Sequence, residues 1–272
     1  MHWRTLRRGR QVRGDAAVLR PDPQRRIAED GGLRCGQRSG RGLGEADHRT
    51  SFAIVSYRIV IGEEATARDP RLLGRVGTEE VVFVVDPIDG TKNFVSGVPL
   101  FGTMIACVAR GQTIFSAIHD PVCASTAFAA RGEGAWVAGP DGTKQTLGVS
   151  AVVDPCEMRA VAGANFMPEP MRSMFLRNST KLGLSFWMRC CPHEYRMAAA
   201  GNCDLLVYNK LAPWDHLAGF LLHQEAGGYG AHLNGDPYRV GDLDGGLMCA
   251  PNREAWTAAH RMLFAEGQGA FA

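Results

Sequence analysis

Short apolar runs separated by polar turns dominate residues 51–150. The run FAIVSYRIVIGEE, which begins at Phe52, is rich in β-branched residues and predicts a strand, and a polar loop is expected over 65–80. The run VVFVV at 81–85 is fully apolar and predicts a strand buried on both faces. Segments 99–122 and 125–137 each contain a short turn and predict two β-hairpins. Because no helix separates these strands, this half is expected to be α+β with an antiparallel sheet.

The pattern changes in residues 151–272, where strand-like and helical segments alternate. Strands are expected at 160–165, 204–209 and 246–251, and helices at 169–182, 193–201, 215–228 and 252–264. The helix at 215–228 is expected to end at its paired glycines, as helices commonly do. This second half therefore has an α/β pattern.

Residues 1–50 differ in composition from the remainder of the chain. They hold 12 arginines and 6 acidic residues, a balance of +6, whereas the whole chain has a net charge of +2. Their apolar positions show no spacing of 3.6 residues, so we expect an atypical, poorly ordered segment. An Arg- and Gly-rich sequence of this kind is also what an altered reading frame in GC-rich DNA would encode. Because aromatic residues are not interleaved with the arginines of residues 1–50, the net positive charge of this segment does not indicate nucleic-acid binding.

The overall composition is that of a globular protein with a sizeable core, since 45% of the 272 residues are hydrophobic. No apolar run reaches about 18 residues, and no apolar segment follows the N-terminal arginines, so neither a membrane span nor a secretory signal is expected. We therefore expect a cytoplasmic protein. None of the eight cysteines forms a C-x-x-C pair, and most lie in apolar runs, which predicts reduced and buried thiols.

Two aspartates follow the apolar run at 81–85, in the sequence DPIDGT over 86–91. Burying a carboxylate at the end of a core strand costs free energy unless a partner compensates it. The proline fixes its own φ and disfavours helical geometry at Asp86, so a set turn can aim Asp86, the Ile88 carbonyl and Asp89 at one point. Such an all-oxygen environment suits Mg²⁺. The alternative is an Asx-type turn with solvated aspartates.

Other acidic residues occupy comparable positions. Glu63 and Glu64 follow a strand-like run, so they either join the aspartates or form an ordinary exposed acidic pair. Asp215 follows Pro213 and Trp214 at the start of an apolar helix, where a helix N-cap is the simpler interpretation. The neighbouring His216 is expected to face a side of the helix. His119, His193 and His223 have no metal-binding spacing and are interpreted as structural.

The strings GEE, DPIDGTKNF and WDHLAG with EAGG, in that order, resemble the inositol monophosphatase family of magnesium-dependent, lithium-sensitive phosphatases. The resemblance covers roughly residues 59–265. It implies a layered α-β-α-β-α sandwich like that of the inositol monophosphatases and fructose-1,6-bisphosphatases, preceded here by the atypical N-terminal segment. It also implies Mg²⁺ as cofactor, a small phosphate monoester as the binding partner, and a homodimer.

The resemblance implies a metal role for five residues. Glu63 matches a ligand that also helps to activate a water molecule. Asp86 matches an aspartate that bridges two metals, and Ile88 matches a residue that coordinates through its carbonyl. Asp89 and Asp215 match ligands of the second metal. The reaction so implied is in-line attack of a metal-activated water on a phosphate monoester.

The resemblance also implies which residues bind the substrate. Gly90 and Thr91 fall where the family binds phosphate through backbone N–H groups, and Thr91 also orients the attacking water. Asp89 and Asp215 border the same site. Tyr208 stands where inositol phosphatases place an acidic residue that contacts ring hydroxyls, so a broader substrate preference is expected.

The chain also departs from the family pattern. The usual amphipathic helix and D-x-V-T-x-x-D segment before GEE are not readable. Three interpretations follow. The first is an inositol monophosphate phosphatase. The second is a histidinol-phosphate phosphatase or another sugar or nucleotide phosphatase of the superfamily, since SGVPLFGTMIA resembles the histidinol-phosphate branch. The third is a catalytically impaired protein that binds phosphate or metal.

Overall fold

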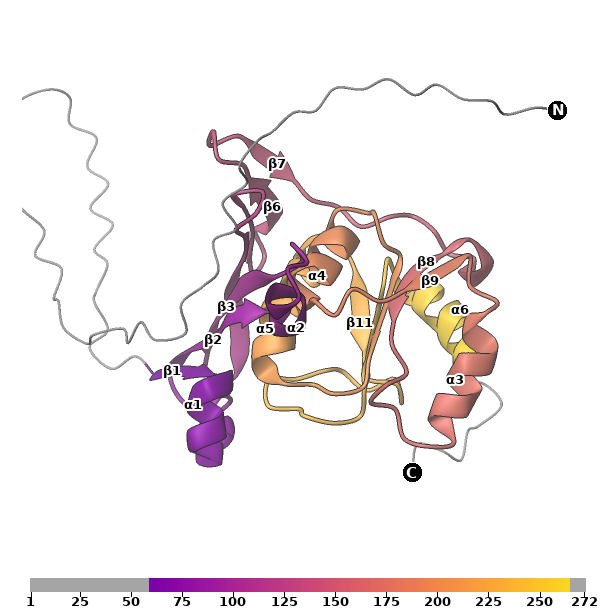
Figure 1. Ribbon diagram of the computed structural model, residues 1–272, viewed down its shortest axis with the longest axis horizontal. Helices are drawn as coiled ribbons and strands as arrows, with labels where there is room; N and C mark the ends of the chain where they lie inside the picture. Colours follow the sequence, from indigo (N-terminus) through magenta and orange to yellow (C-terminus); the bar gives the residue numbers. More distant parts are fainter. Residues whose placement is uncertain (1–58, 265–272) are drawn as a thin grey trace, which may run out of the picture. The chain divides into compact units, whose positions relative to one another are not determined.

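The computed structural model describes residues 59–264 (Figure 1). The expected disorder of residues 1–50 and the strand expected from Phe52 to residue 58 lie outside the described residues. The chain from residue 54 onward groups as one unit by its internal contacts. The unit that begins at residue 54 carries every described element.

The first sheet has seven strands in sequence order. They are β1 (Ile59–Gly62), β2 (Val81–Asp89), β3 (Gly102–Ala109), β4 (Gln112–Asp120), β5 (Ser125–Ala130), β6 (Gly134–Ala138) and β7 (Lys144–Thr146). β1 and β2 pair in parallel, and every later neighbouring pair is antiparallel. The two predicted hairpins are therefore confirmed as β3–β4 and β5–β6. β3 and β4 are joined by Arg110 and Gly111, which both have positive φ.

Strand β2 differs from its prediction in burial and in length. Its residues alternate between buried and half-buried, with Val82, Val84 and Asp86 on the buried side. The prediction of a strand buried on both faces was wrong, because only one face of this sheet is fully covered. The strand also continues to Asp89, with an irregular register between Asp86 and Asp89. The two aspartates therefore belong to the strand end itself.

The segment between β1 and β2 contains helical turns, although a loop was predicted. The structure has α1 (Glu63–Arg68) followed by the 3₁₀ helix η1 (Pro70–Arg75). A further short helix, α2 (Thr91–Val95), begins directly after β2. Helices of one or two turns carry too few apolar positions to produce a readable 3.6-residue pattern.

The second sheet has five strands in the order β11-β12-β10-β8-β9. They are β8 (Arg159–Ala162), β9 (Leu184–Phe186), β10 (Leu205–Tyr208), β11 (Tyr229–Ala231) and β12 (Leu247–Ala250), with helices η2 (Pro155–Glu157), α3 (Met171–Ser179), α4 (Cys191–Ala199), α5 (Pro213–Glu225) and α6 (Arg253–Phe264). All three strands and all four helices predicted in this half are present within a few residues of their expected bounds. The strands that were missed, β9 and β11, have three residues each.

The elements stack in layers, as the resemblance implies (Figure 1). Helices α4 and α5 pack on each other; α5 also packs on the first sheet and α4 on β10 of the second. Helices α3 and α6 pack together, and α6 lies on β11 and β12. The α4–α5 contact is close because Gly219 of α5 lies against the Tyr195 ring, where a Cβ atom would overlap the ring. This helix pair fixes where α5 begins relative to the end of β2.

The cysteine prediction is partly wrong in burial. The cysteines of the described residues are free; Cys190, Cys203 and Cys249 are buried, whereas Cys123 and Cys156 are exposed. Cys123 lies in a turn and Cys156 in the short helix η2, and the apolar residues around them did not indicate this exposure. Within residues 59–264, no helix combines the length and apolarity needed to cross a membrane.

Candidate active site

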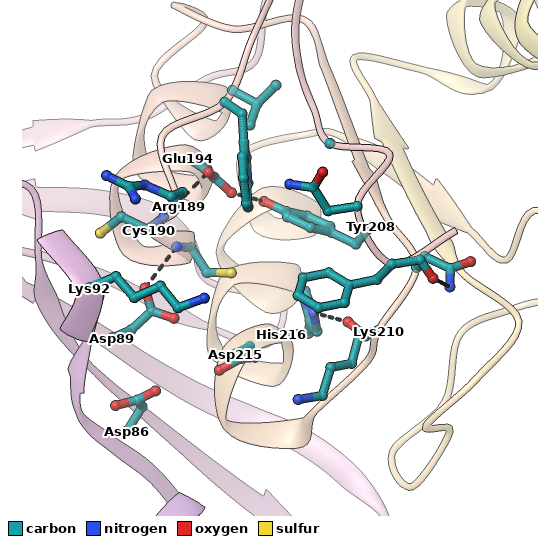
Figure 2. A pocket seen from close by; sticks show the side chains of 18 of the residues that line it. Asp86, Asp89, Lys92, Arg189, Cys190, Glu194, Tyr208, Lys210, Asp215 and His216 are labelled. Carbon is teal, nitrogen blue, oxygen red and sulfur yellow. Dashed lines mark hydrogen bonds between the residues drawn. The ribbon is translucent and has the colours of Figure 1, made fainter. Parts of the chain in front are cut away.

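Three aspartates from two elements meet beside one pocket (Figure 2). Asp86 and Asp89 come from the end of β2, and Asp215 comes from the first turn of α5. Each offers a carboxylate oxygen within 4.8 Å of the others. Asp86 is buried, and the other two are half-buried. We call these three residues the aspartate triad.

Local structure explains how the triad is aimed. The Ile88 N–H donates to Asp86 Oδ1 at 2.9 Å, which is the Asx-type turn that was considered as an alternative. The Cys191 N–H donates to Asp89 Oδ1, also at 2.9 Å. Gly90 turns the chain with φ of 84°, and a Cβ there would stand 2.7 Å from the Leu100 carbonyl oxygen. The Asx turn is therefore present, and it orients a buried carboxylate instead of a solvated one.

Asp215 is not a helix cap. The N-cap of α5 is Ala212, and Asp215 stands three residues later with its side chain in the pocket. The simpler interpretation of this residue was therefore wrong. Within the described helix α5, no backbone N–H donates to the Asp215 carboxylate, so capping does not explain its position. The nearby carboxylates of Asp86 and Asp89 indicate a shared role instead.

The triad residues hold raised pKa values in the absence of a cation. Burial raises the pKa of Asp89 to about 8, and the charges of Asp215 and Asp86 add to the shift. Burial, followed by the charges of Asp86 and Glu63, raises the pKa of Asp215 to about 7. Burial also raises the pKa of Asp86, to about 6, against the opposing Ile88 N–H bond. Like charges at this spacing disfavour joint ionisation unless a proton or a cation compensates them.

These features fit a hard divalent cation. Carboxylate oxygens from several elements are the ligands that Mg²⁺ takes in proteins. None of the triad carboxylates forms an ion pair with another residue of the described range 59–264. A bound cation would supply the missing positive charge, so the residues present match the expected cofactor.

The remaining residues predicted for the metal and the phosphate have different placements. Glu63 is exposed at the start of α1 and lines the same pocket, outside the 4.8 Å triad. Gly90 and Thr91 also line the pocket, and the Thr91 hydroxyl donates to the Ile88 carbonyl at 2.9 Å. Ile88 itself is 41% exposed and does not line the pocket. The Ile88 carbonyl oxygen, which was predicted to coordinate a metal, therefore already accepts a hydrogen bond from the Thr91 hydroxyl.

The pocket has a volume of about 310 Å³ and extends from the triad toward β10 and α4. Tyr208, for which a substrate contact is expected, is one of the residues that line it. Its hydroxyl donates to Glu194 Oε2 at 3.0 Å. The side-chain amide of the next residue, Asn209, donates to the Phe166 carbonyl. One amide N–H of Asn209 therefore holds the loop that contains Phe166, while Asn209 itself lines the pocket.

His216 was expected to face a side of its helix. It does lie on α5, but it is also buried in the wall of the pocket, so the expectation was correct only in part. Its Nε2 lies 2.8 Å from the Lys210 carbonyl, which can only accept, so this nitrogen carries the proton. Its Nδ1 then accepts from the Tyr195 hydroxyl at 3.1 Å. Burial lowers the pKa of His216 to about 4, which keeps the ring neutral. The ring is a fixed part of the wall.

Several pocket residues were missed by sequence reasoning. They are Lys92, Phe166, Trp187, Arg189, Cys190, Cys191 and Glu194. Phe166 and Trp187 are large apolar side chains, 60% and 44% exposed. The segment 187–191 is held from two sides, because Asn93 Nδ2 donates to the Met188 carbonyl at 2.8 Å and Glu194 accepts from the Met188 N–H. No local pattern in the sequence marks this segment as part of a site.

Comparison with known proteins supports the same assignment. A sequence profile described as the inositol monophosphatase family matches residues 50–266. An inositol-1-monophosphatase of Mesorhizobium japonicum is 32% identical over 60% of this chain and 58% of its own length. A histidinol-phosphatase of Chlorobaculum parvum is 30% identical over 62% of this chain and 63% of its own length.

The fold is shared with solved structures. The inositol monophosphatase II of Staphylococcus aureus superimposes with a TM-score of 0.68 at 21% identity, over 79% of this chain and 77% of the other. The chain spans about three fifths of the length of the curated relatives it matches. Because the family profile matches most of the chain and the fold agrees, this protein belongs to the inositol monophosphatase family.

Proposed function

We propose that the chain hydrolyses a small phosphate monoester in a reaction that depends on Mg²⁺. The observation that carries this proposal is the aspartate triad, three carboxylates from two elements with oxygens within 4.8 Å and no ion pair among residues 59–264. A structural role does not explain it, because clustered buried carboxylates destabilise the fold. Membership of a family whose relatives carry phosphatase names supports the same conclusion.

The proposal assigns distinct roles to the aspartate triad, to Thr91 and to Glu63. Asp86, Asp89 and Asp215 would hold Mg²⁺, which lowers the pKa of a bound water and neutralises phosphate charge when present. The Thr91 hydroxyl donates its proton to Ile88, so its oxygen offers lone pairs to a water proton. Glu63 lies at the pocket edge, where its carboxylate can accept that proton.

Positive charge at the pocket would help to bind the phosphate. Lys92, Arg189 and Lys210 line the pocket, and Lys210 is close enough to Asp215 to favour its ionised form. Cations at the mouth of a cleft attract an anionic ester and offset the repulsion from the carboxylates. The Gly90 and Thr91 backbone N–H groups are the further phosphate donors of the proposal.

Inositol monophosphate is the proposed substrate. Tyr208 lies in the pocket where an acidic side chain would contact ring hydroxyls, and its hydroxyl provides a polar atom there. A neutral hydrogen bond is roughly half as strong as a charge-assisted one, so the preference for inositol should be weaker than a carboxylate would give. Histidinol phosphate is the second candidate, because the exposed rings of Phe166 and Trp187 offer flat apolar surfaces to an imidazole.

The test is hydrolysis of an aryl phosphate with and without Mg²⁺, followed by a comparison of inositol 1-phosphate with histidinol phosphate. We expect activity only with Mg²⁺, inhibition by Li⁺, and loss of most activity in Asp215→Asn. Turnover by Asp215→Asn equal to that of the wild type would exclude the metal assignment. A preference above about a hundredfold for histidinol phosphate, or ~2.7 kcal/mol, would reverse the ranking of substrates. Absence of hydrolysis with Mg²⁺ bound would favour a binding protein.

A further inference from the structure

The Glu194 carboxylate is buried beside the pocket and linked to two of its walls. Its side chain is 1% exposed, although the residue lines the pocket. Oε1 accepts from the Met188 N–H at 3.3 Å and from the Cys190 N–H at 3.4 Å. Oε2 accepts from the Tyr208 hydroxyl at 3.0 Å (Figure 2). One carboxylate therefore joins the segment before α4 to the end of β10.

This contact fixes the direction of the Tyr208 hydroxyl proton. Burial raises the pKa of Glu194, whereas the hydrogen bonds from the Tyr208 hydroxyl and from two backbone N–H groups favour its ionised form. An ionised carboxylate has only lone pairs, so the Tyr208 hydroxyl is the donor in this bond. A phenol has a single proton, and that proton is then committed to Glu194. The oxygen of Tyr208 can therefore offer only lone pairs to a molecule in the pocket. Toward the substrate, Tyr208 is an acceptor and not a donor.

From this geometry we infer that Glu194 makes Tyr208 an acceptor-only contact that selects leaving groups carrying a hydrogen-bond donor, such as a hydroxyl or an ammonium. The inference rests on the proposed phosphatase function and concerns its substrate class. Glu194 is a positioning residue, because it acts through Tyr208 and touches no substrate atom. An ester whose only polar group at this place is an ether or a carbonyl oxygen finds no donor and leaves Tyr208 unpaired, which lowers its transition-state binding.

A purely structural role for Glu194 is the competing explanation. Cys190 is the N-cap of α4, and Glu194, four residues later, accepts from its N–H in a way that resembles the capping box, in which the Glu or Gln stands three residues after the N-cap. A glutamine side chain can keep this cap with its amide oxygen at the Oε1 position. At the Oε2 position it would then place an NH₂ group, which can only donate. Tyr208 would have to accept that bond, and its proton would be released toward the pocket.

The substitution Glu194→Gln therefore separates the two explanations. If Glu194 is only a cap, Gln replaces it and substrate preference stays the same. If Glu194 sets the polarity of Tyr208, Gln turns the acceptor into a donor. Tyr208→Phe is the second variant, which removes the oxygen and keeps the ring. Tyr195→Phe is the matched control, because Tyr195 is fully buried, does not line the pocket, and loses a comparable bond, to His216.

The experiment compares kcat/KM, with Mg²⁺, for two phosphate monoesters that have uncharged ring substituents, trans-2-hydroxycyclohexyl phosphate and its 2-methoxy analogue. We expect the wild type and Tyr195→Phe to prefer the hydroxy ester by about tenfold, the size of one hydrogen bond. In Glu194→Gln and Tyr208→Phe this ratio should fall to about twofold or less. The kcat/KM of Glu194→Gln for the methoxy ester should also rise, which a steric effect of the methyl group cannot produce.

Two results would overturn the inference while leaving the phosphatase function intact. One is a wild-type ratio near one, and the other is a ratio unchanged by both Glu194→Gln and Tyr208→Phe. If neither ester, nor an aryl phosphate, is hydrolysed with Mg²⁺, the phosphatase proposal itself fails and the inference fails with it. Near-ultraviolet circular dichroism of each variant identifies any loss of folding, and Tyr208→Phe provides the ratio if Glu194→Gln does not fold.

Discussion

Replacing Asp215 by asparagine should stabilise the metal-free protein at pH 8. The folded-state pKa of Asp215 is raised from 3.8 to about 7, so the folded state binds a proton more tightly than the unfolded state does. Stability therefore falls as pH rises from about 4 to about 7, where the folded protein must give up this proton. A neutral amide of nearly the same shape has no such loss.

The size of the effect follows from the pKa difference. A rise from 3.8 to about 7 corresponds to at most ~4 kcal/mol of unfolding free energy at pH 8. Asp215 is half-buried and shares its repulsion with Asp86, so solvent screening and relaxation reduce this value. We expect Asp215→Asn to gain about 2 kcal/mol at pH 8 without metal, and a smaller gain at pH 5.

The assay is urea unfolding in the presence of a chelator at pH 5 and pH 8, followed by thermal unfolding with increasing Mg²⁺. The wild type should gain Tm with Mg²⁺, and the variant should gain much less, because binding to the folded state is weakened. Asp204→Asn is the matched control. Asp204 is also buried, but Arg159 holds it through bonds at 2.8 and 2.9 Å, and this pairing lowers the pKa of Asp204. That variant should lose about 2 kcal/mol or more.

A lower stability of Asp215→Asn than of the wild type at pH 8 without metal would refute the reasoning. It would mean that Asp215 makes a stabilising contact that outweighs the repulsion within the triad. Equal responses of wild type and variant to Mg²⁺ would separately exclude Asp215 as a ligand. The opposite signs expected for Asp215→Asn and Asp204→Asn distinguish a functional carboxylate from a structural one.

Two further substitutions test the packing around the site. Gly219→Ala should destabilise the fold by about 1–3 kcal/mol in urea unfolding, because the added methyl group would overlap the Tyr195 ring; an unchanged midpoint would contradict this contact. Asn93→Ala should cost about 2 kcal/mol, since it leaves the Leu100 and Met188 carbonyls without their donor, and it should raise KM through the segment that begins at residue 187. A loss of stability with KM unchanged would show that this segment does not contact substrate.

The local sequence determined most of the longer elements and the placement of two of the three triad aspartates. Asp86 and Asp89 stand three positions apart around a proline, and this spacing alone places both at the end of one strand. Hairpins and the longer helices were also predictable, because their patterns repeat over many residues. One- and two-turn helices such as α2 were not predictable, since their pattern is too short.

Only the tertiary structure shows how distant residues come together with Asp86 and Asp89. The local pattern around Asp215 resembles a helix cap, and only the resemblance to a family motif marked it as a ligand; it joins the triad because α5 packs against the first sheet with its N-terminal turn at the end of β2. Glu194 resembles an ordinary polar residue of a helix. Its burial, and its bond to Tyr208, arise because α4 and β10 are adjacent in space. A sequence states which side chains are available, whereas the environment that sets their charge and hydrogen-bond polarity exists only after the layers pack.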